Sequence, residues 1–231
     1  MLNEAFYDMG VHAYPEGGSS ASMLGLTAKK YGYSGICVAD HSDLFTEKNA
    51  ENLEGIEVIR GVEVVAGNQN ELRKLVDRYR KRVRVLTVHG GDPIINRAAC
   101  EDERVDILAH PADGKTSGIN HILAKLAADK HIAIAFELAP LICAKGGSRV
   151  RALSNYRTNL ALVKKYDTPY VIISGAMSHY DMRDVRAAIA LCSLFGMSEK
   201  DAVKGLSFYP SEILRRHSPG YIMEGVEILG F

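Results

Sequence analysis

Imidazole and carboxylate side chains recur in this sequence directly after short apolar runs. His12, His41 and His110 each follow such a run, and Asp40 immediately precedes His41. If the runs are parallel strands, their carboxyl ends meet at one rim and bring these side chains into one site. Imidazole nitrogens and carboxylate oxygens are ligands of the divalent metals that hydrolyse phosphoesters. The candidate cluster consists of His12, Asp40, His41, Glu63, His110 and Glu137, with His89 in the same kind of position.

The rhythm of the chain predicts the elements that position these side chains. Short β-branched apolar runs alternate with longer segments of helical period, which is typical of repeated strand and helix units in a parallel sheet. Seven strands are predicted, at residues 6–11, 35–39, 57–65, 83–88, 106–109, 132–138 and 170–173. Seven strands in 231 residues, without a repeat or linker, favour one α/β domain over 1–231. We expect a TIM-barrel-like barrel surrounded by helices, with an open sheet as the alternative.

Capping signals predict where several helices begin. Asp181 is a candidate N-cap for a helix that carries residues 185–192, with Gly196 as its stop. Ser198 begins a sequence that resembles a capping box. Pro210 suits the first turn of a last helix over 211–216. Two glycine-rich stretches, 14–20 and 144–148, are predicted as loops after strands, on the face where barrels build their sites.

The formal net charge is zero, from 28 basic and 28 acidic residues, which argues against a protein that is basic over its whole surface. The charges are nevertheless segregated. Residues 138–166 contain no acid and six basic side chains, and residues 73–84 contain seven basic side chains and one acid. No apolar run approaches the roughly 18 residues of a membrane span, so we expect a cytoplasmic protein without membrane contact. The four cysteines are widely spaced and are predicted to be free thiols.

Several short motifs resemble those of the polymerase and histidinol phosphatase (PHP) superfamily, whose barrel holds two or three metal ions for phosphoester hydrolysis. They are Asp40-His41, Gly61-Val62-Glu63-Val64, Ala109-His110-Pro111 and Phe136-Glu137. That superfamily opens with His-x-His and closes with Asp-x-His, whereas this chain has Gly10, Gly175 and Met177 at the corresponding donors. Glycine offers no ligand atom, and a thioether is a poor ligand for hard metals. The cluster is therefore interpreted as a vestigial polar network without catalytic residues or a bound cofactor. A PHP-type metal-dependent phosphoesterase is the alternative.

A closer resemblance extends over nearly the whole chain. Its motifs are Phe6-Tyr7-Asp8, Val11-His12-Ala13, His89-Gly90-Gly91-Asp92, Ile95-Asn96-Arg97-Ala98-Ala99, the run 105–111 (VDILAHP), the run 118–125 (GINHILAK) and Phe136-Glu137-Leu138. In this order they resemble the ribonuclease P protein component 3 family. The resemblance implies an accessory subunit of an enzyme whose catalytic RNA uses magnesium to remove 5′ leaders from precursor tRNA. It also implies a small partner protein of ferredoxin-like fold.

RNA binding requires cations that reach phosphates, and the planar guanidinium of Arg can also stack on unpaired bases. The stretch 144–148 and its surroundings suit this, because Lys145, Arg149, Arg151 and Arg157 have no acid nearby in the sequence. Further candidates are Arg97 and Lys125 in the family motifs, and Lys115 and Arg183 in loops after strands. Two blander interpretations remain open: these cations form a solvated helix face, or the chain is a scaffold that binds only proteins.

Overall fold

Seven parallel strands form a barrel in which each strand pairs with the next one in the chain. The computed structural model describes residues 4–46, 53–218, 220–223 and 226–227. The strands are β1 (Tyr7–Val11), β2 (Gly35–Val38), β3 (Glu57–Val64), β4 (Val85–His89), β5 (Ile107–Ala109), β6 (Ala133–Glu137) and β7 (Tyr170–Ile173). The predicted TIM-barrel-like α/β fold is confirmed, and every predicted strand end lies within two residues of the observed one.

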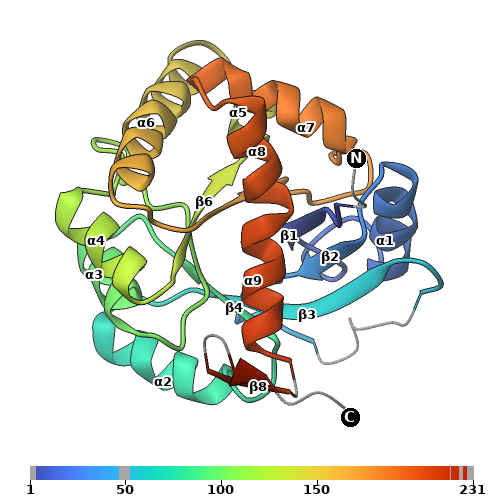
Figure 1. Ribbon diagram of the computed structural model, residues 1–231, viewed down its shortest axis with the longest axis horizontal. Helices are drawn as coiled ribbons and strands as arrows, with labels where there is room; N and C mark the ends of the chain where they lie inside the picture. The colour runs from blue at the N-terminus through green and yellow to red at the C-terminus, as the bar shows by residue number, and fades with distance from the viewer. Residues whose placement is uncertain (1–3, 47–52, 219, 224–225, 228–231) are drawn as a thin grey trace.

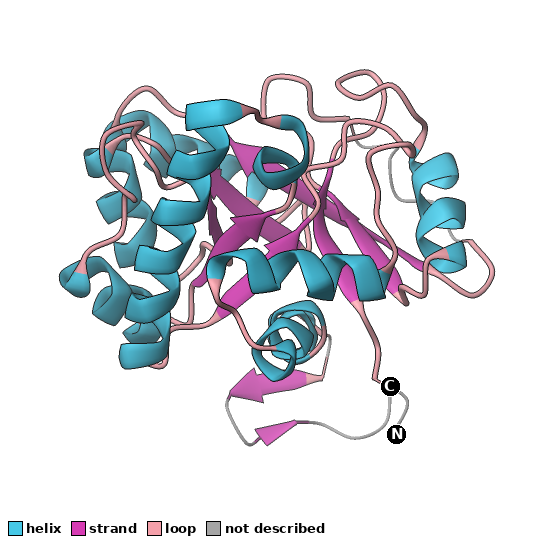
Figure 2. Ribbon diagram, turned by 90° about the horizontal axis from the view of Figure 1, so that it is seen from above, coloured by secondary structure: helices cyan, strands magenta, loops and turns pink. Residues whose placement is uncertain are grey.

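The helices surround the strands, which lie in the centre of Figure 2. They are α1 (Ala21–Lys30), α2 (Gln69–Tyr79), α3 (Pro93–Glu101), α4 (His121–Asp129), α5 (Ala139–Cys143), α6 (Gly146–Lys165), α7 (Val185–Cys192), the 3-10 helix η2 (Ser193–Phe195), α8 (Glu199–Leu206) and α9 (Phe208–Arg216). A short antiparallel pair, β8 (Tyr221–Met223) and β9 (Val226–Glu227), follows α9. In the described part of the chain, no helix has both the length and the apolar character needed to cross a membrane.

Two apolar layers pack against the two faces of the barrel, which explains why its strands are nearly continuous apolar runs. The side chains inside the barrel mix small ones, as at Cys37, Ala109 and Ala135, with larger ones, as at Ile59 and Ile107. The side chains facing the helices include large ones, as at Leu86 and Ile134, which are fully buried. Burial of each large side chain contributes about 1.5–3 kcal/mol relative to exposure. The barrel therefore forms a filled core and not a channel.

The barrel closes between β1 and β7 through a short seam. The backbone N–H of Gly175 donates to the Gly10 carbonyl at 3.0 Å, and that of His12 donates to the Ala176 carbonyl at 2.9 Å. A Cβ at position 10 would lie 3.0 Å from Cβ of Ile173, so glycine permits the two strands to approach. In the sequence, Gly10 was interpreted as the position of a lost metal ligand. The close approach of β1 and β7 leaves no room for an imidazole there.

Helix α9, in the middle of Figure 1, lies across the end of the barrel where the strands begin. Its Ile213 and Leu214 are buried against the inner layer. Beside them the buried carboxylate of Asp106 accepts hydrogen bonds from Arg80 and His217, both at 2.6 Å. These charge-assisted bonds tie the last helix to β5, so the barrel has a closed bottom and one open end.

Three local predictions were wrong in detail. Asp184, and not Asp181, caps α7, because its side chain accepts from the Ala187 N–H at 3.0 Å. Asp181 instead accepts from Ser178. The last helix begins at Phe208 rather than after Pro210. The stretch 144–148 is not a loop directly after a strand, since α5 intervenes and α6 begins at Gly146.

Other capping signals were correct. Ser198 caps α8 by accepting from the Asp201 N–H at 3.2 Å, and its hydroxyl contacts the Asp201 carboxylate at 2.7 Å. Gly196 ends the 3-10 helix in the left-handed region, with φ of 88°. Both signals act within four residues, so they depend little on the rest of the fold.

Candidate functional site

Four imidazole rings form a row across the open end of the barrel, here called the mouth. The rings of His12 and His41 stack with centroids 5.2 Å apart, His41 and His89 are also 5.2 Å apart, and His89 stacks on His110 at 4.6 Å. Each histidine lies at or just after the carboxyl end of a different strand, so parallel strand order alone brings them together. The structure thus places the histidines that the sequence singled out in one site.

Glu63 lies under the middle of the row and is almost fully buried. Its Oε1 is 2.6 Å from Nδ1 of His89, 3.5 Å from Nε2 of His110 and 3.8 Å from Nε2 of His41. Burial alone would raise the pKa of this carboxyl, but the hydrogen bond from His89 and the nearby imidazoles lower it. Glu63 is therefore the central anion of the mouth.

Glu16 is a member of this site that sequence reasoning missed. It lies in the loop 14–20, and its carboxylate accepts from the backbone N–H of His41 at 2.7 Å and contacts the ring of that histidine. Its Oε2 is also 3.3 Å from Nδ1 of His12. Burial raises the pKa of Glu16, but its bonds with the two histidines lower it to about 2. The sequence feature that could have identified Glu16 is its position four residues after His12 in a glycine-rich loop.

The other end of the row is a close pair, His110 and Glu137. The two side chains approach to 3.2 Å, and the backbone of His110 has a left-handed φ of 47°. Burial would lower the pKa of His110, but the hydrogen bond and charge of Glu137, together with Glu63, raise it to about 9. His110 is therefore a cation at neutral pH, and Glu137 neutralises it.

Asp40, the remaining predicted member, holds the backbone at the start of the loop 14–20, and its charge also acts on His12. Its buried carboxylate accepts from the backbone N–H of Ala13 at 2.7 Å. Further along this loop, the Gly18 N–H donates to the Met177 carbonyl at 2.6 Å, and a Cβ at Gly17 would lie 2.2 Å from the His12 carbonyl oxygen. The loop therefore closes over the seam between β1 and β7 and carries Glu16 into the mouth.

The mouth can gather ligand atoms, but it does not reproduce the metal site of the PHP superfamily. Two groups of three side chains place ligand atoms within 4.8 Å of one another; they are His12, Glu16 and His41, and His41, Glu63 and His89. At the seam, however, Gly175 stands where the superfamily has a carboxylate, and a Cβ there would lie 1.8 Å from Oε1 of Glu137. The carboxylate of Glu137 fills that space. A bridged site of two or three ions therefore does not fit these residues.

The three cations predicted after the sixth strand lie at the start of α6 and are all exposed. Lys145 is the N-cap residue of α6. Arg149 folds back and donates to the carbonyls of Ala144 at 2.7 Å and Ile142 at 3.1 Å. Arg151 points its guanidinium toward Ser148 at 3.4 Å. The structure thus keeps these cations together, on a helix start rather than on a loop.

The other five predicted cations are spread over several elements. Lys125 on α4 and Lys115 in the loop after β5 are exposed. Arg97 on α3 is exposed but pairs with Glu101 at 2.8 Å. Arg157 donates to the carbonyl of Leu194 at 3.0 Å, away from the start of α6. Arg183 is partly buried and donates to three carbonyls of its own turn, at 2.8–3.1 Å. Lys125 lies on a helix next to the one that carries Arg149 and Arg151, since α4 packs against α6.

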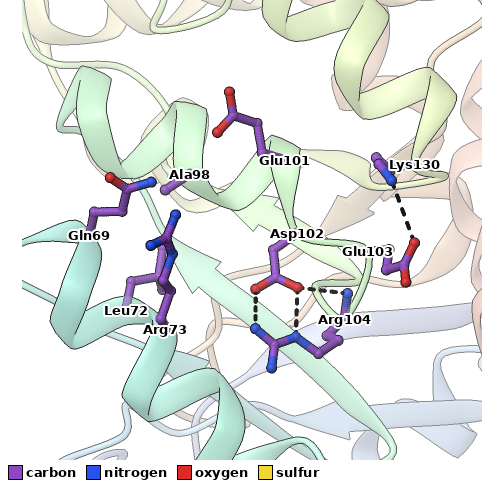
Figure 3. A pocket seen from close by; sticks show the side chains of 9 residues that line it. All are labelled: Gln69, Leu72, Arg73, Ala98, Glu101, Asp102, Glu103, Arg104 and Lys130. Carbon is purple, nitrogen blue, oxygen red and sulfur yellow. Dashed lines mark hydrogen bonds and ion pairs between the residues drawn. The ribbon is translucent and has the colours of Figure 1, made fainter.

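A second groove of about 370 Å³ lies outside the mouth, between α2 and the end of α3 (Figure 3). Acids and bases line it together. Arg104 binds Asp102 at 2.6 Å and also contacts Asp77, while Lys130 and Glu103 are 3.5 Å apart. Because acids and bases are mixed along its lining, this groove offers no field of one sign to a charged ligand.

Comparison with known proteins agrees with the motif resemblance. The family model described as RNase P subunit p30 matches residues 5–219. The chain is 45% identical to ribonuclease P protein component 3 of Methanococcoides burtonii, over 99% of this chain and 95% of the relative. It is 44% identical to the protein of that name from Methanosarcina mazei, over 97% of this chain and 95% of the relative.

Solved structures give the same result for the fold. A chain in a cryo-EM structure of archaeal ribonuclease P with mature tRNA is 25% identical to this chain, and the two superpose with a TM-score of 0.80. The match covers 96% of this chain and 98% of that chain. Histidinol phosphate phosphatase from Lactococcus lactis, complexed with zinc, L-histidinol and phosphate, is 14% identical with a TM-score of 0.54, covering 83% of this chain and 94% of that chain. The second likeness shows the barrel fold alone. The chain therefore belongs to the RNase P subunit p30 family of ribonuclease P proteins.

Proposed function

We propose that this chain is a non-catalytic subunit of ribonuclease P, which supports the catalytic RNA in removing the 5′ leader from precursor tRNA. The observation that carries the non-catalytic role is the seam of the mouth. There Gly175 replaces a donor, and Glu137 occupies the space beside it. Within the mouth, Glu16, Glu63 and Glu137 pair with the imidazoles of the chain itself. Cleavage chemistry, including its magnesium ions, is accordingly assigned to the RNA.

The proposed RNA-binding surface is centred on the start of α6. Lys145, Arg149 and Arg151 are exposed there, and helix α6 contributes free N–H groups and the positive end of its dipole. Lys115 and Lys125 extend this surface toward α4. Phosphate contacts from such a surface position an RNA without reading its sequence. Arg97 is a weaker member because Glu101 neutralises it, and Arg157 and Arg183 are weaker because they donate to carbonyls away from the start of α6.

The family resemblance also supports a small partner subunit of ferredoxin-like fold, and we propose a complex of both proteins with the catalytic RNA. The structure of the related archaeal ribonuclease P contains a mature tRNA. We propose by extension that the holoenzyme containing this chain binds precursor tRNA and acts in the cytoplasm.

The RNA-binding surface is tested by salt dependence of affinity. The Lys145→Ala/Arg149→Ala/Arg151→Ala variant is expected to bind the catalytic RNA more weakly, with a log–log salt slope lower by about 2–3, because each phosphate contact contributes about 0.7–0.9. A matched control removes three exposed cations on α7 and α8, in the variant Arg186→Ala/Lys200→Ala/Lys204→Ala. An unchanged slope in the first variant, or equal losses in both, would remove the start of α6 from the interface.

The non-catalytic role is tested by cleavage of precursor tRNA at limiting magnesium, by the catalytic RNA and partner subunit with and without this chain. A His110→Ala/Glu137→Ala variant that remains folded is expected to stimulate cleavage as well as the wild type. Stimulation by the wild type alone would favour the alternative, a PHP-type metal-dependent phosphoesterase, for which the two groups of potential ligands in the mouth are the supporting observation.

A further inference from the structure

A cavity of about 260 Å³ opens beside His110, between the loop after β5 and the first turns of α6. One part of its lining is apolar and includes Pro111, Pro140 and Ala152. The cavity is smaller than the roughly 300 Å³ at which sites for drug-sized ligands begin. It therefore suits a single flat group rather than an extended ligand.

The other part of the lining is polar and contains an unsatisfied acceptor. Asn159 is 3% exposed and lines the cavity. Its Nδ2 donates to the carbonyl of Ser117 at 3.1 Å, while its Oδ1 has no hydrogen-bond partner within the described residues. A buried acceptor without a partner costs free energy, which a bound donor would recover. Asn155, one turn earlier on α6, adds a second amide to the same lining.

Charged side chains also line the cavity, and they are Arg151, His110 and Glu137. Arg151 belongs to the lining and donates to the hydroxyl of Ser148 at 3.4 Å. His110 and Glu137 lie on the side facing the mouth and pair with each other at 3.2 Å, so Arg151 is the cation of this lining that can reach a phosphate. Tyr156 forms a fixed wall, because its hydroxyl donates to the Glu137 carbonyl at 2.8 Å and its ring packs edge-on against Phe136.

We infer that this cavity binds one unpaired nucleobase of RNA, with its flat face against the prolines and Ala152 and a donor on its edge directed to Asn159. Arg151 then contacts the phosphate of the same nucleotide. A base combines an apolar face with a polar edge, and RNA recognition relies on unstacked bases held in this manner. A free phosphate would leave the apolar part of the lining unused. The inference rests on the proposed RNA-binding function and adds a contact at the level of a single nucleotide.

The test combines a substitution that fills the cavity with RNAs that each lack one unpaired base. The whole chain, as Ala152→Leu, is compared with Ala161→Leu, which adds the same group to an exposed position of the same helix. Catalytic RNAs in which unpaired nucleotides are made abasic one at a time serve as the probe. We expect Ala152→Leu to weaken binding about tenfold, as for loss of one stacked base. We also expect one abasic position to weaken the wild type equally, without further weakening Ala152→Leu. Ala161→Leu should bind as the wild type does.

Two results would overturn the inference. One is that a folded Ala152→Leu chain binds the RNA as tightly as the wild type does. The other is that every abasic substitution that weakens binding to the wild type weakens binding to Ala152→Leu by the same factor. Should Ala152→Leu not fold, Asn155→Ala replaces it, with the same expected coupling to one abasic position. If the wild type binds RNA without such coupling, only the nucleobase site fails. If the wild type neither binds RNA nor stimulates cleavage, the proposed function fails and the nucleobase site with it.

Discussion

Substitution of Gly175 by alanine tests whether Glu137 has taken the space of the missing metal ligand. Gly175 has a φ of 64°, and a Cβ there would lie 1.8 Å from Oε1, 2.6 Å from Cδ and 2.8 Å from Cγ of Glu137. Two costs therefore add. The left-handed backbone costs an alanine about 1–2 kcal/mol, and overpacking against the carboxylate costs about 1–3 kcal/mol more.

Gly196→Ala separates these two costs. Gly196 also has a positive φ, of 88°, but a Cβ there would have no atom of the described residues within 4 Å. It should lose only the backbone part, about 1–2 kcal/mol. Gly175→Ala should lose about 2–5 kcal/mol in total, so the difference between the two variants measures the overlap with Glu137.

Urea unfolding of the two single variants, of Glu137→Ala and of Gly175→Ala/Glu137→Ala gives the free energies of unfolding. Removing the Glu137 side chain beyond Cβ eliminates all three close contacts. The loss in free energy of unfolding of the double variant should therefore be about 1–3 kcal/mol smaller than the sum of the losses of Gly175→Ala and Glu137→Ala. Strict additivity in this cycle, or equal losses in Gly175→Ala and Gly196→Ala, would refute the reasoning.

The pKa of His110 gives a prediction about pH. Because this pKa is raised to about 9, the His110–Glu137 pair should stabilise the fold fully below the unfolded value of about 6.5, and the contribution should be lost as pH rises through 9. NMR titration should find His110 protonated at pH 8 in the wild type and not in Glu137→Gln; a normal pKa in the wild type would contradict this. Cys143 is the exposed thiol, and burial raises the pKa of Cys100 and Cys192 to about 12. Alkylation of the native chain should therefore modify Cys143 alone, and rapid reaction of further thiols would show that the core opens.

The sequence predicted the barrel well because its strands are buried on both faces. Such strands are continuous apolar runs with little dependence on their neighbours, so residues 35–38 or 170–173 are recognisable locally. Caps that act within one turn, such as Ser198, are local in the same sense. Where two acids lie three residues apart, as Asp181 and Asp184 do, the path of the chain decides which one becomes the cap.

The convergence of histidines on one mouth also followed from strand order, but what neutralises them did not. Glu16 enters the mouth because a loop folds over the seam, which depends on pairing between β1 and β7 across more than 160 residues. Likewise, the sequence shows that Gly175 has lost a ligand, and only the fold shows that Glu137 fills its place.

The candidate RNA-binding cations divide in the same way. Charge along the sequence determined that basic side chains gather between residues 138 and 166 without an acid. Tertiary structure decided which of them remain available, since Arg157 reaches a distant carbonyl while Arg151 lines a cavity. Composition fixes how many charges a segment carries, but hydrogen bonds to distant backbone depend on how the helices pack. For that reason only the folded barrel distinguishes an exposed cation from one already bound within the chain.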